Sequence, residues 1–332
     1  MSTTKYILGM RDRFFEALFE IAKKDKDLIV VSADNGAPSL DQFSFDLENQ
    51  FVTVGIAEQQ MQGMACGLAT EGKKVYTYAI APFVTARIFE QNKIAQCAMN
   101  LPIVNIGIGA GYSYSVMGPS HHTVEDLTIM RVLPQMKIYS PADGVTAQAL
   151  AQISYDDASP QYIRFDRAGI ADLYLENDVD FNEGLHALRP GRDGYIIATG
   201  IMTHEALKVA KNINTKTGLD VGVIDLFRIK PINKEKLFQI LQPTSFVMTY
   251  EEHLLNGGMG SAIAELFADE SFFKPLLRIG QDDRFVYDNG GREVIWQKYG
   301  MDAASVTERL HQWLKEQRLI SAPAPVVQRT SS

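Results

Sequence analysis

A single carboxylate, Glu58, lies in a run of small and apolar residues, VGIAEQQMQGMACGLA, where a predicted strand is followed by a predicted helix. An acid in the first turn of a helix interacts favourably with the helix dipole, which is worth about 0.3–1 kcal/mol. That contact alone explains an isolated glutamate. The small apolar neighbours, however, indicate burial, and Gly63 and Gly67 are each unfavourable in a helix by about 1 kcal/mol relative to alanine, which suggests close approach of another backbone. The sequence is therefore compatible with two interpretations of Glu58, a helix-end contact and a buried functional carboxyl.

Two adjacent histidines, His121 and His122, lie in the segment GYSYSVMGPSHHTVEDLTIMRVLP, just before a predicted helix. Thr123 and Asp126 have the spacing of a capping box at the start of that helix. Because a helix N-terminus disfavours a charged imidazole, a neutral, hydrogen-bonding histidine is expected there. The alternative is a pair of polar loop residues. A metal site is disfavoured, because no third ligand falls at a recognisable spacing.

Two arginines, Arg164 and Arg167, end a predicted strand in the segment YIRFDRAG. In open parallel sheets, ligands bind at the carboxyl ends of the strands. Arginine at such a place suits a phosphate, because its planar guanidinium matches the phosphate oxygens. The competing interpretation is a local salt bridge of both arginines with Asp166.

The elements that must position these residues alternate between strands and helices, which predicts an α/β fold with two doubly wound domains. We expect a first domain over residues 1–175, a linker over 176–191, a second domain over 192–318 and a flexible tail over 319–332. In the first domain we expect strands at 27–34, 51–54, 74–80, 102–109, 136–143 and 161–166, helices at 10–24, 57–70, 82–100, 123–132 and 144–155, and a turn-rich loop at 35–42.

The composition excludes several classes of protein. The chain has 332 residues and a formal net charge of −8, without a long basic run, so a nucleic-acid partner is not expected. Cys66 and Cys97 form no metal-type pair, and no apolar stretch is long enough for a signal peptide or a membrane span. These features predict a reduced, cytoplasmic setting. The nucleotide-binding patterns GxxxxGK[ST] and GxGxxG after the first strand are absent, as is the GxSxG pattern of hydrolases.

Taken together, the segments resemble the transketolase family of thiamine diphosphate enzymes. VGIAEQQMQGMACGLA is similar to the segment that carries the family's catalytic glutamate, and GPSHHTVEDLTIMRVLPQMKIYSPAD resembles its long histidine-containing motif. APFVTARIFEQ resembles the helix whose aromatic residue stacks on the cofactor. IIATGIMTHEALKVAK, IDLFRIKPI and EEHLLNGGMGSAIAE resemble the family's C-terminal domain. The resemblance covers about residues 10–317 and implies a thiamine diphosphate-binding, pyrimidine-type domain followed by a transketolase C-terminal domain.

The resemblance also implies roles for residues. Glu58 would hydrogen-bond a ring nitrogen of the aminopyrimidine and, with His121, act in catalysis. The residues expected to bind the cofactor are Glu58, Phe83 and Asp34. The residues expected to bind the substrate are His121, His122, Arg164, Arg167, Ser39 and Arg87, with Arg167 the first choice for a sugar phosphate. No metal ligand is expected in this chain.

One family motif is absent. Family members bind the cofactor's diphosphate through Mg²⁺ in a separate domain with a GDG…N motif, and this sequence contains no GDG. The chain therefore resembles the C-terminal half of a split transketolase, and we expect it to be inactive alone. A partner subunit carrying GDG…N would supply the diphosphate and Mg²⁺ site, in an α2β2 assembly around a homodimeric core.

The expected reaction is transfer of a two-carbon ketol unit between sugar or sugar phosphate substrates. Met117 stands where family members often carry an acid that bonds a sugar hydroxyl, and Ile80 and Ala86 replace two aromatic residues near Phe83. These departures point to a specialised sugar. The alternatives are a 2-oxo acid dehydrogenase β subunit, an enzyme similar to 1-deoxyxylulose-phosphate synthase, and a non-catalytic subunit.

Overall fold

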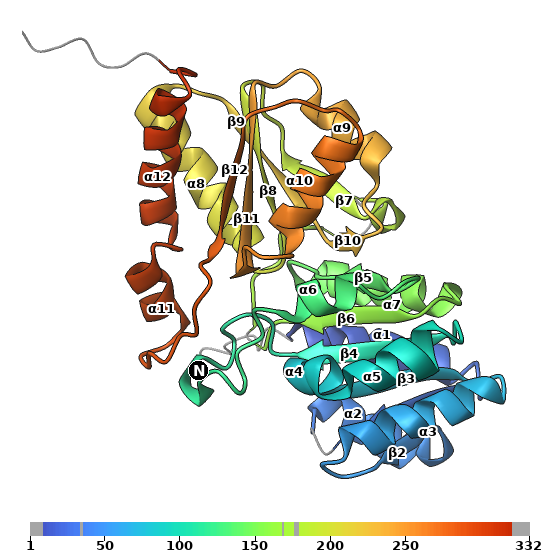
Figure 1. Cartoon of the computed structure of the whole chain (residues 1–332). Coiled ribbons are helices and arrows are strands. Elements are labelled where there is room, and N and C mark those ends of the chain that lie inside the picture. Colours follow the sequence, from blue (N-terminus) through green and yellow to red (C-terminus); the bar gives the residue numbers. More distant parts are fainter. Residues whose placement is uncertain (1–8, 34–35, 168, 176–178, 321–332) are drawn as a thin grey trace, which may run out of the picture.

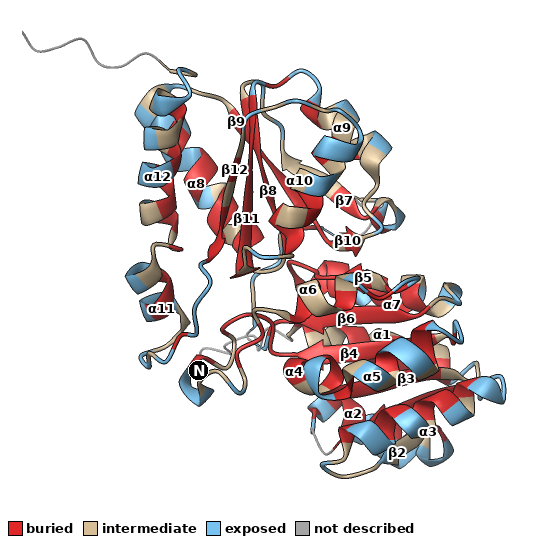
Figure 2. Ribbon diagram, in the orientation of Figure 1, coloured by how far each residue is buried: buried red, intermediate tan, exposed pale blue. Residues whose placement is uncertain are grey.

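The computed structural model describes residues 9–33, 36–167, 169–175 and 179–320, which form two α/β domains, one above the other in Figure 1. The sequence pattern explains the architecture. Fully buried apolar strands alternate with helices that cover both faces of each sheet, as Figure 2 shows by the buried colour of the strands. No helix among the described residues is long and apolar enough to span a membrane.

The first sheet has seven strands in the order β10-β5-β6-β4-β3-β1-β2. All neighbouring pairs are parallel except β10 with β5. The strands are β1 (Leu28–Ser32), β2 (Phe51–Thr53), β3 (Lys74–Ile80), β4 (Ile103–Ile108), β5 (Lys137–Tyr139), β6 (Gln161–Phe165) and β10 (Arg228–Lys230). Because β10 follows the first strands of the second domain in the sequence, it ties the two domains together at the sheet edge.

Helices cover both faces of the first sheet. One face packs on α1 (Met10–Ala22), α2 (Pro38–Asp46) and α7 (Gly144–Asp156), and the other on α3 (Glu58–Thr70) and α6 (Asp126–Arg131). The apolar cluster on the second face continues from Met61 and Leu127 through Ile229 to Leu237 and Ile263 of the second domain. The two domains therefore share one hydrophobic core.

Two local predictions in the first domain are wrong. The loop expected at 35–42 contains the start of α2, where a proline in the first turn presets the helical backbone and Leu40 and Phe43 are buried. The helix expected at 82–100 is broken into α4 (Ala81–Val84), a 3₁₀ turn, α5 (Phe89–Gln91) and a π-helical segment over Asn92–Cys97. Thr85 leaves the helical conformation, and buried side chains bond the carbonyls that the helix would use: Thr85 donates to Ala81, and Asn92 donates to Val84.

The second sheet has five strands in the order β12-β11-β8-β9-β7, of which only the edge strand β7 is antiparallel. β7 lies inside the segment expected to be a linker. One face packs on α8, α11 and α12, and the other on α9 and α10. The elements are β7 (Leu185–Arg189), β8 (Gly194–Ala198), α8 (Met202–Thr217), β9 (Val221–Leu226), α9 (Lys234–Leu241), β11 (Phe246–Leu254), α10 (Met259–Asp269), β12 (Leu276–Gln281), α11 (Arg292–Tyr299) and α12 (Ala303–Glu316).

Candidate functional site

Glu58 is the first residue of α3, directly after the turn that follows β2. Its side chain is only 4% exposed, so the burial that its small neighbours indicate is present. The carboxylate does not lie in a purely apolar setting, because its Oε2 accepts a hydrogen bond of 2.7 Å from Nη1 of Arg87. A buried carboxylate at a helix start is thus held by a cation whose own side chain is 40% exposed.

Phe83 completes this arrangement from α4, which follows β3. The Arg87 guanidinium carbon lies 3.7 Å from the centre of the Phe83 ring. One flat, cationic group therefore contacts an aromatic face and donates an N–H to the buried carboxylate at the same time. These two contacts are the ones that a flat heterocycle with an N–H group would make in the same place.

His121 also contacts Phe83. Its ring packs edge-on against Phe83 at 5.4 Å and against Tyr114 at 6.0 Å, measured between ring centroids. Its Nδ1 lies 3.0 Å from Oγ of Ser120. The Tyr114 ring fits only because residue 109 is glycine: a Cβ at Gly109 would lie 2.2 Å from that ring, and its φ of +98° also favours glycine.

Arg167 lies next to Tyr114. Its guanidinium carbon lies 5.0 Å from the centre of the Tyr114 ring, and the residue is exposed. We call Glu58, Arg87, Phe83, His121, Tyr114 and Arg167 the ring cluster. Its members follow β2, β3, β4 and β6 in the sequence, so the carboxyl ends of neighbouring parallel strands bring them together.

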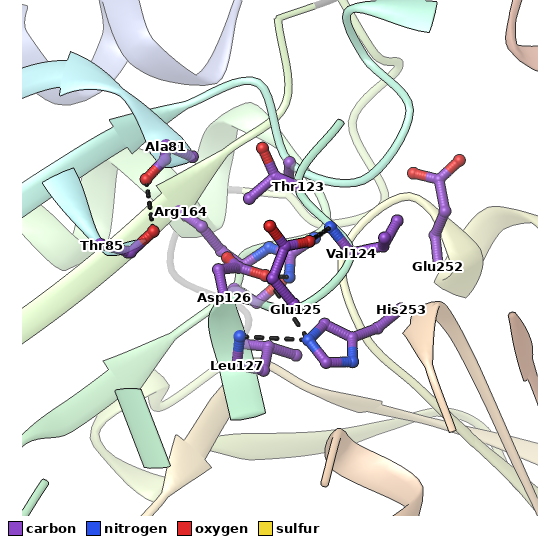
Figure 3. A network of polar contacts seen from close by, with 12 residues as sticks. Ala81, Thr85, Thr123, Val124, Glu125, Asp126, Leu127, Arg164, Glu252 and His253 are labelled. Carbon is purple, nitrogen blue, oxygen red and sulfur yellow. Dashed lines mark hydrogen bonds and ion pairs between the residues drawn. The ribbon is translucent and has the colours of Figure 1, made fainter. Parts of the chain in front are cut away.

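Arg164, only three residues before Arg167, lies in a different setting. It is 5% exposed, and its Nη1 donates to Oδ1 of Asp126 at 2.7 Å. Asp126 also accepts from the Tyr162 hydroxyl at 2.7 Å, and His253 of the second domain lies beside it (Figure 3). Burial lowers the pKa of His253 to about 4, so the buried pair faces a neutral imidazole. Arg164 is thus held in an ion pair beneath the strand ends.

The same contacts correct one prediction and decide between two interpretations. The capping box is not formed, because the Asp126 carboxylate bonds Arg164 and Tyr162, while the Thr123 hydroxyl donates to the carbonyl of His121. The competing interpretation, a local salt bridge of Arg164 and Arg167 with Asp166, does not describe Arg164, which pairs with Asp126, while Asp166 pairs with Arg292 of the second domain.

His122 points away from the ring cluster. Its Nε2 lies 3.2 Å from the carbonyl oxygen of Ser115, and its ring packs edge-on against Tyr112. Burial lowers its pKa, which keeps the imidazole neutral. It lines a cavity of about 390 Å³ between the first domain and the segment around Phe285. The two adjacent histidines therefore have different surroundings.

Ser39 belongs to a separate polar group. Its hydroxyl donates to Oδ1 of Asp12 at 2.9 Å, and Arg11 bonds both Asp12 and the hydroxyl of Tyr78 on β3. Asp34 lies outside the described residues. Within the parts of the chain that the structure describes, no three His, Cys, Asp or Glu side chains are grouped so that they could hold a metal ion.

Some residues of the site are not apparent from the sequence. Tyr114, which contacts both His121 and Arg167, is not among the residues that the sequence predicts. The only signal is the pair of glycines at positions 109 and 111, where the Tyr114 ring and the Glu252 carboxylate approach the backbone closely. Glu252 and Arg292 contact this loop from the second domain. No spacing in the sequence signals them, because they lie more than 100 residues from the loop residues that they contact.

Comparison with known proteins gives the following matches. Residues 8–171 match the family model of the transketolase pyrimidine-binding domain, and residues 184–306 match that of the transketolase C-terminal domain. A protein named as one of the subunits of apulose-4-phosphate transketolase, from Phocaeicola vulgatus, is 31% identical over 312 residues, which are 93% of this chain and 99% of that protein. One of the subunits of 6-deoxy-6-sulfo-D-fructose transketolase, from a Clostridium species, is 33% identical over 306 residues, 91% of this chain and 94% of that protein.

Among solved structures, one described as a split gene transketolase in an inactive β4 tetramer superimposes with a TM-score of 0.82 at 31% identity, covering 93% of this chain and 98% of that chain.

Proposed function

This chain belongs to the transketolase family, and we propose that it is the C-terminal subunit of a two-chain, thiamine diphosphate-dependent enzyme. The enzyme transfers a two-carbon ketol unit between sugar substrates. The observation that carries the proposal is the pair of contacts that Arg87 makes with Glu58 and Phe83. Relatives named as transketolase subunits match this chain over almost their whole length, which supports the assignment to a split enzyme.

The residues around Arg87 fit the aminopyrimidine of thiamine diphosphate. The guanidinium is flat and carries N–H donors, and it contacts both the carboxylate of Glu58 and the ring of Phe83. When bound, thiamine diphosphate supplies an electron sink for the carbanion of the transferred unit. Phe83 would stack on the ring, and Glu58, 4% exposed, would share a proton with a ring nitrogen away from water. We also propose Asp34 as a cofactor-binding residue.

The substrate side of the site is formed by His121 and Arg167. The His121 ring is held between Phe83 and Tyr114, from which it would hydrogen-bond substrate hydroxyls. Arg167 is exposed beside Tyr114, and we propose that it binds the sugar's phosphate or another anionic group. Ser39 and Arg87 remain further candidates for this role. The positions of Arg164 and His122 favour structural roles over substrate contact.

The partner would supply what this chain lacks. The sequence contains no GDG motif, so we propose that a subunit carrying GDG…N binds the diphosphate and Mg²⁺. Two copies of each subunit would form an α2β2 enzyme in the cytoplasm. The ring cluster lies at the carboxyl ends of the strands, where a partner's cofactor-binding face would meet it.

Reconstitution tests this proposal. The chain is co-expressed with a GDG…N subunit, purified, and supplied with Mg²⁺, thiamine diphosphate, a ketose donor and an aldose acceptor. We expect ketol transfer by the two chains together and none by either alone. Transfer of an acyl group to lipoamide with loss of CO₂, or a requirement for pyruvate as donor, would contradict it in favour of the dehydrogenase or the deoxyxylulose-phosphate synthase reaction.

A further inference from the structure

Arg292, the first residue of α11, connects the second domain with the first. Its Nε donates to Oε1 of Glu252 at 2.9 Å, one Nη pairs with Asp166 at the end of β6, and the other donates to the carbonyl of Ala110 at 3.3 Å. The side chain is 13% exposed. Burial by itself lowers the pKa of Arg292, but the charges of Asp166 and Glu252 raise it above its usual range, so the guanidinium stays charged. A partly buried cation is thus shared between the two domains.

Glu252, near the end of β11, contacts the same loop of the first domain. It accepts a hydrogen bond of 3.0 Å from the backbone N–H of Tyr112 and another from the indole of Trp296. The loop lies so close that a Cβ at Gly111 would lie 1.8 Å from the Glu252 carboxylate, and φ at Gly111 is +59°. Only glycine fits there, which indicates that the loop is pressed against this carboxylate.

These contacts end next to two members of the ring cluster. The Ser113 hydroxyl donates to Asp166 at 2.8 Å, and Tyr114 follows it in the same loop. Arg167 follows Asp166 directly, and its backbone N–H contacts the Ser113 hydroxyl. The Arg292–Glu252 pair therefore holds the backbone on both sides of the Tyr114–Arg167 contact.

We propose that Arg292 and Glu252 are positioning residues: from the second domain, they fix the 110–114 loop and Asp166 so that Tyr114 and Arg167 face His121. The pair acts on the ring cluster through Ala110, Tyr112 and Asp166. The expected effect of these residues on anion binding rests on the proposed function, because it requires Arg167 to bind the substrate's charged group. Their expected effect on the conformation of the 110–114 loop does not depend on that function.

Arg131 offers a matched control. It also crosses from the first domain to the second, where its guanidinium donates to the carbonyl of Gly258 at 3.1 Å and pairs with Glu265. Its side chain is 15% exposed, close to the value for Arg292. Both of these partners lie in the second domain, away from the 110–114 loop. Arg131→Met and Arg292→Met therefore remove the same kind of interdomain contact at two different places.

The first test is hydrogen exchange on the full chain, and it needs no activity. We expect Arg292→Met and Glu252→Gln to raise the exchange rates of the 110–114 amides by about tenfold or more, with Arg292→Lys intermediate and Arg131→Met unchanged. The amides of α3 should not respond. Equal loop protection in all variants, or the same loss in Arg131→Met, would overturn the proposal. If Arg292→Met does not fold, Glu252→Gln and Arg292→Lys decide the outcome.

The second test uses the two-chain enzyme with donors that carry or lack a phosphate. Arg292→Met should raise KM for the phosphorylated donor by roughly tenfold, while kcat and the KM for the unphosphorylated donor stay within about twofold. An equal loss for both donors would overturn the positioning role. Arg167→Ala is the reference: if it does not discriminate between the donors, the proposed phosphate role is wrong, and hydrogen exchange alone decides whether Arg292 positions the loop.

Discussion

The buried ion pair between Arg164 and Asp126 leads to a prediction about stability. Arg164→Met removes the cation and leaves a carboxylate that is 1% exposed, with the Tyr162 hydroxyl still donating to it and the neutral His253 beside it. Breaking one partner of a buried pair costs about 3–5 kcal/mol, because the remaining charge is desolvated without compensation. Removing both charges in Arg164→Met/Asp126→Asn should recover most of that loss, since the uncompensated charge of Asp126 is removed as well.

The assay is urea unfolding at a fixed chain concentration, followed by far-ultraviolet circular dichroism. We expect the free energy of unfolding to fall by about 3–5 kcal/mol in Arg164→Met, and the double-mutant cycle to show a coupling above about 1 kcal/mol. The exposed Arg167→Met should stay within about 0.5 kcal/mol of the wild type. An Arg164→Met variant about as stable as the wild type, or two substitutions whose effects add without coupling, would show that the ion pair does not stabilise the fold.

Three further predictions concern the site and the second domain. Arg167→Ala should raise KM for a phosphorylated donor by about tenfold or more but not that for an unphosphorylated one; equal effects would remove its phosphate role. Arg87→Ala should lower the Kd for thiamine diphosphate in the two-chain enzyme by about threefold. The reason is that the cation–π contact of Arg87 with Phe83, worth about 0.5–1 kcal/mol, no longer competes with the cofactor ring for the Phe83 face. Weaker binding of the cofactor in calorimetry would contradict this. Burial raises the pKa of Asp225 to about 8, so the folded chain keeps a proton that the unfolded chain releases, and the contribution of this carboxyl to stability is lost as pH rises from about 4 to about 8. Asp225→Asn should reduce that loss in thermal unfolding, and an unchanged pH dependence would contradict the assignment.

The two-domain α/β architecture can be predicted from the sequence because buried parallel strands appear in it as short apolar runs between the helices. The features that the sequence does not reveal have identifiable causes. The edge strand β7 is only partly buried, so it lacks a continuous apolar run, and its sequence resembles that of a linker. β10 pairs with a strand of the other domain, and such a pairing between distant segments leaves no local pattern. The helix over 82–100 breaks because buried Asn92 and Thr85 bond carbonyls, which propensity cannot reveal.

The ring cluster could be predicted in part. Glu58 is recognisable from its small, apolar neighbours, and the carboxyl ends of the strands bring it near Phe83 and His121. The sequence does not separate Arg164 from Arg167, because the partner that holds Arg164, Asp126, lies 38 residues earlier. For the same reason, the contacts of the second domain with the 110–114 loop emerge only from the structure.

The role of Glu58 is tested most directly by the turnover of Glu58→Gln in the reconstituted two-chain enzyme with Mg²⁺ and thiamine diphosphate. The substitution keeps the shape of a side chain that is 4% exposed and removes its ability to share a proton. We expect kcat to fall by about a hundredfold or more while the urea unfolding midpoint and the association with the partner are kept. Turnover within a few-fold of the wild type would contradict the assignment of Glu58 as the carboxyl that acts on the cofactor.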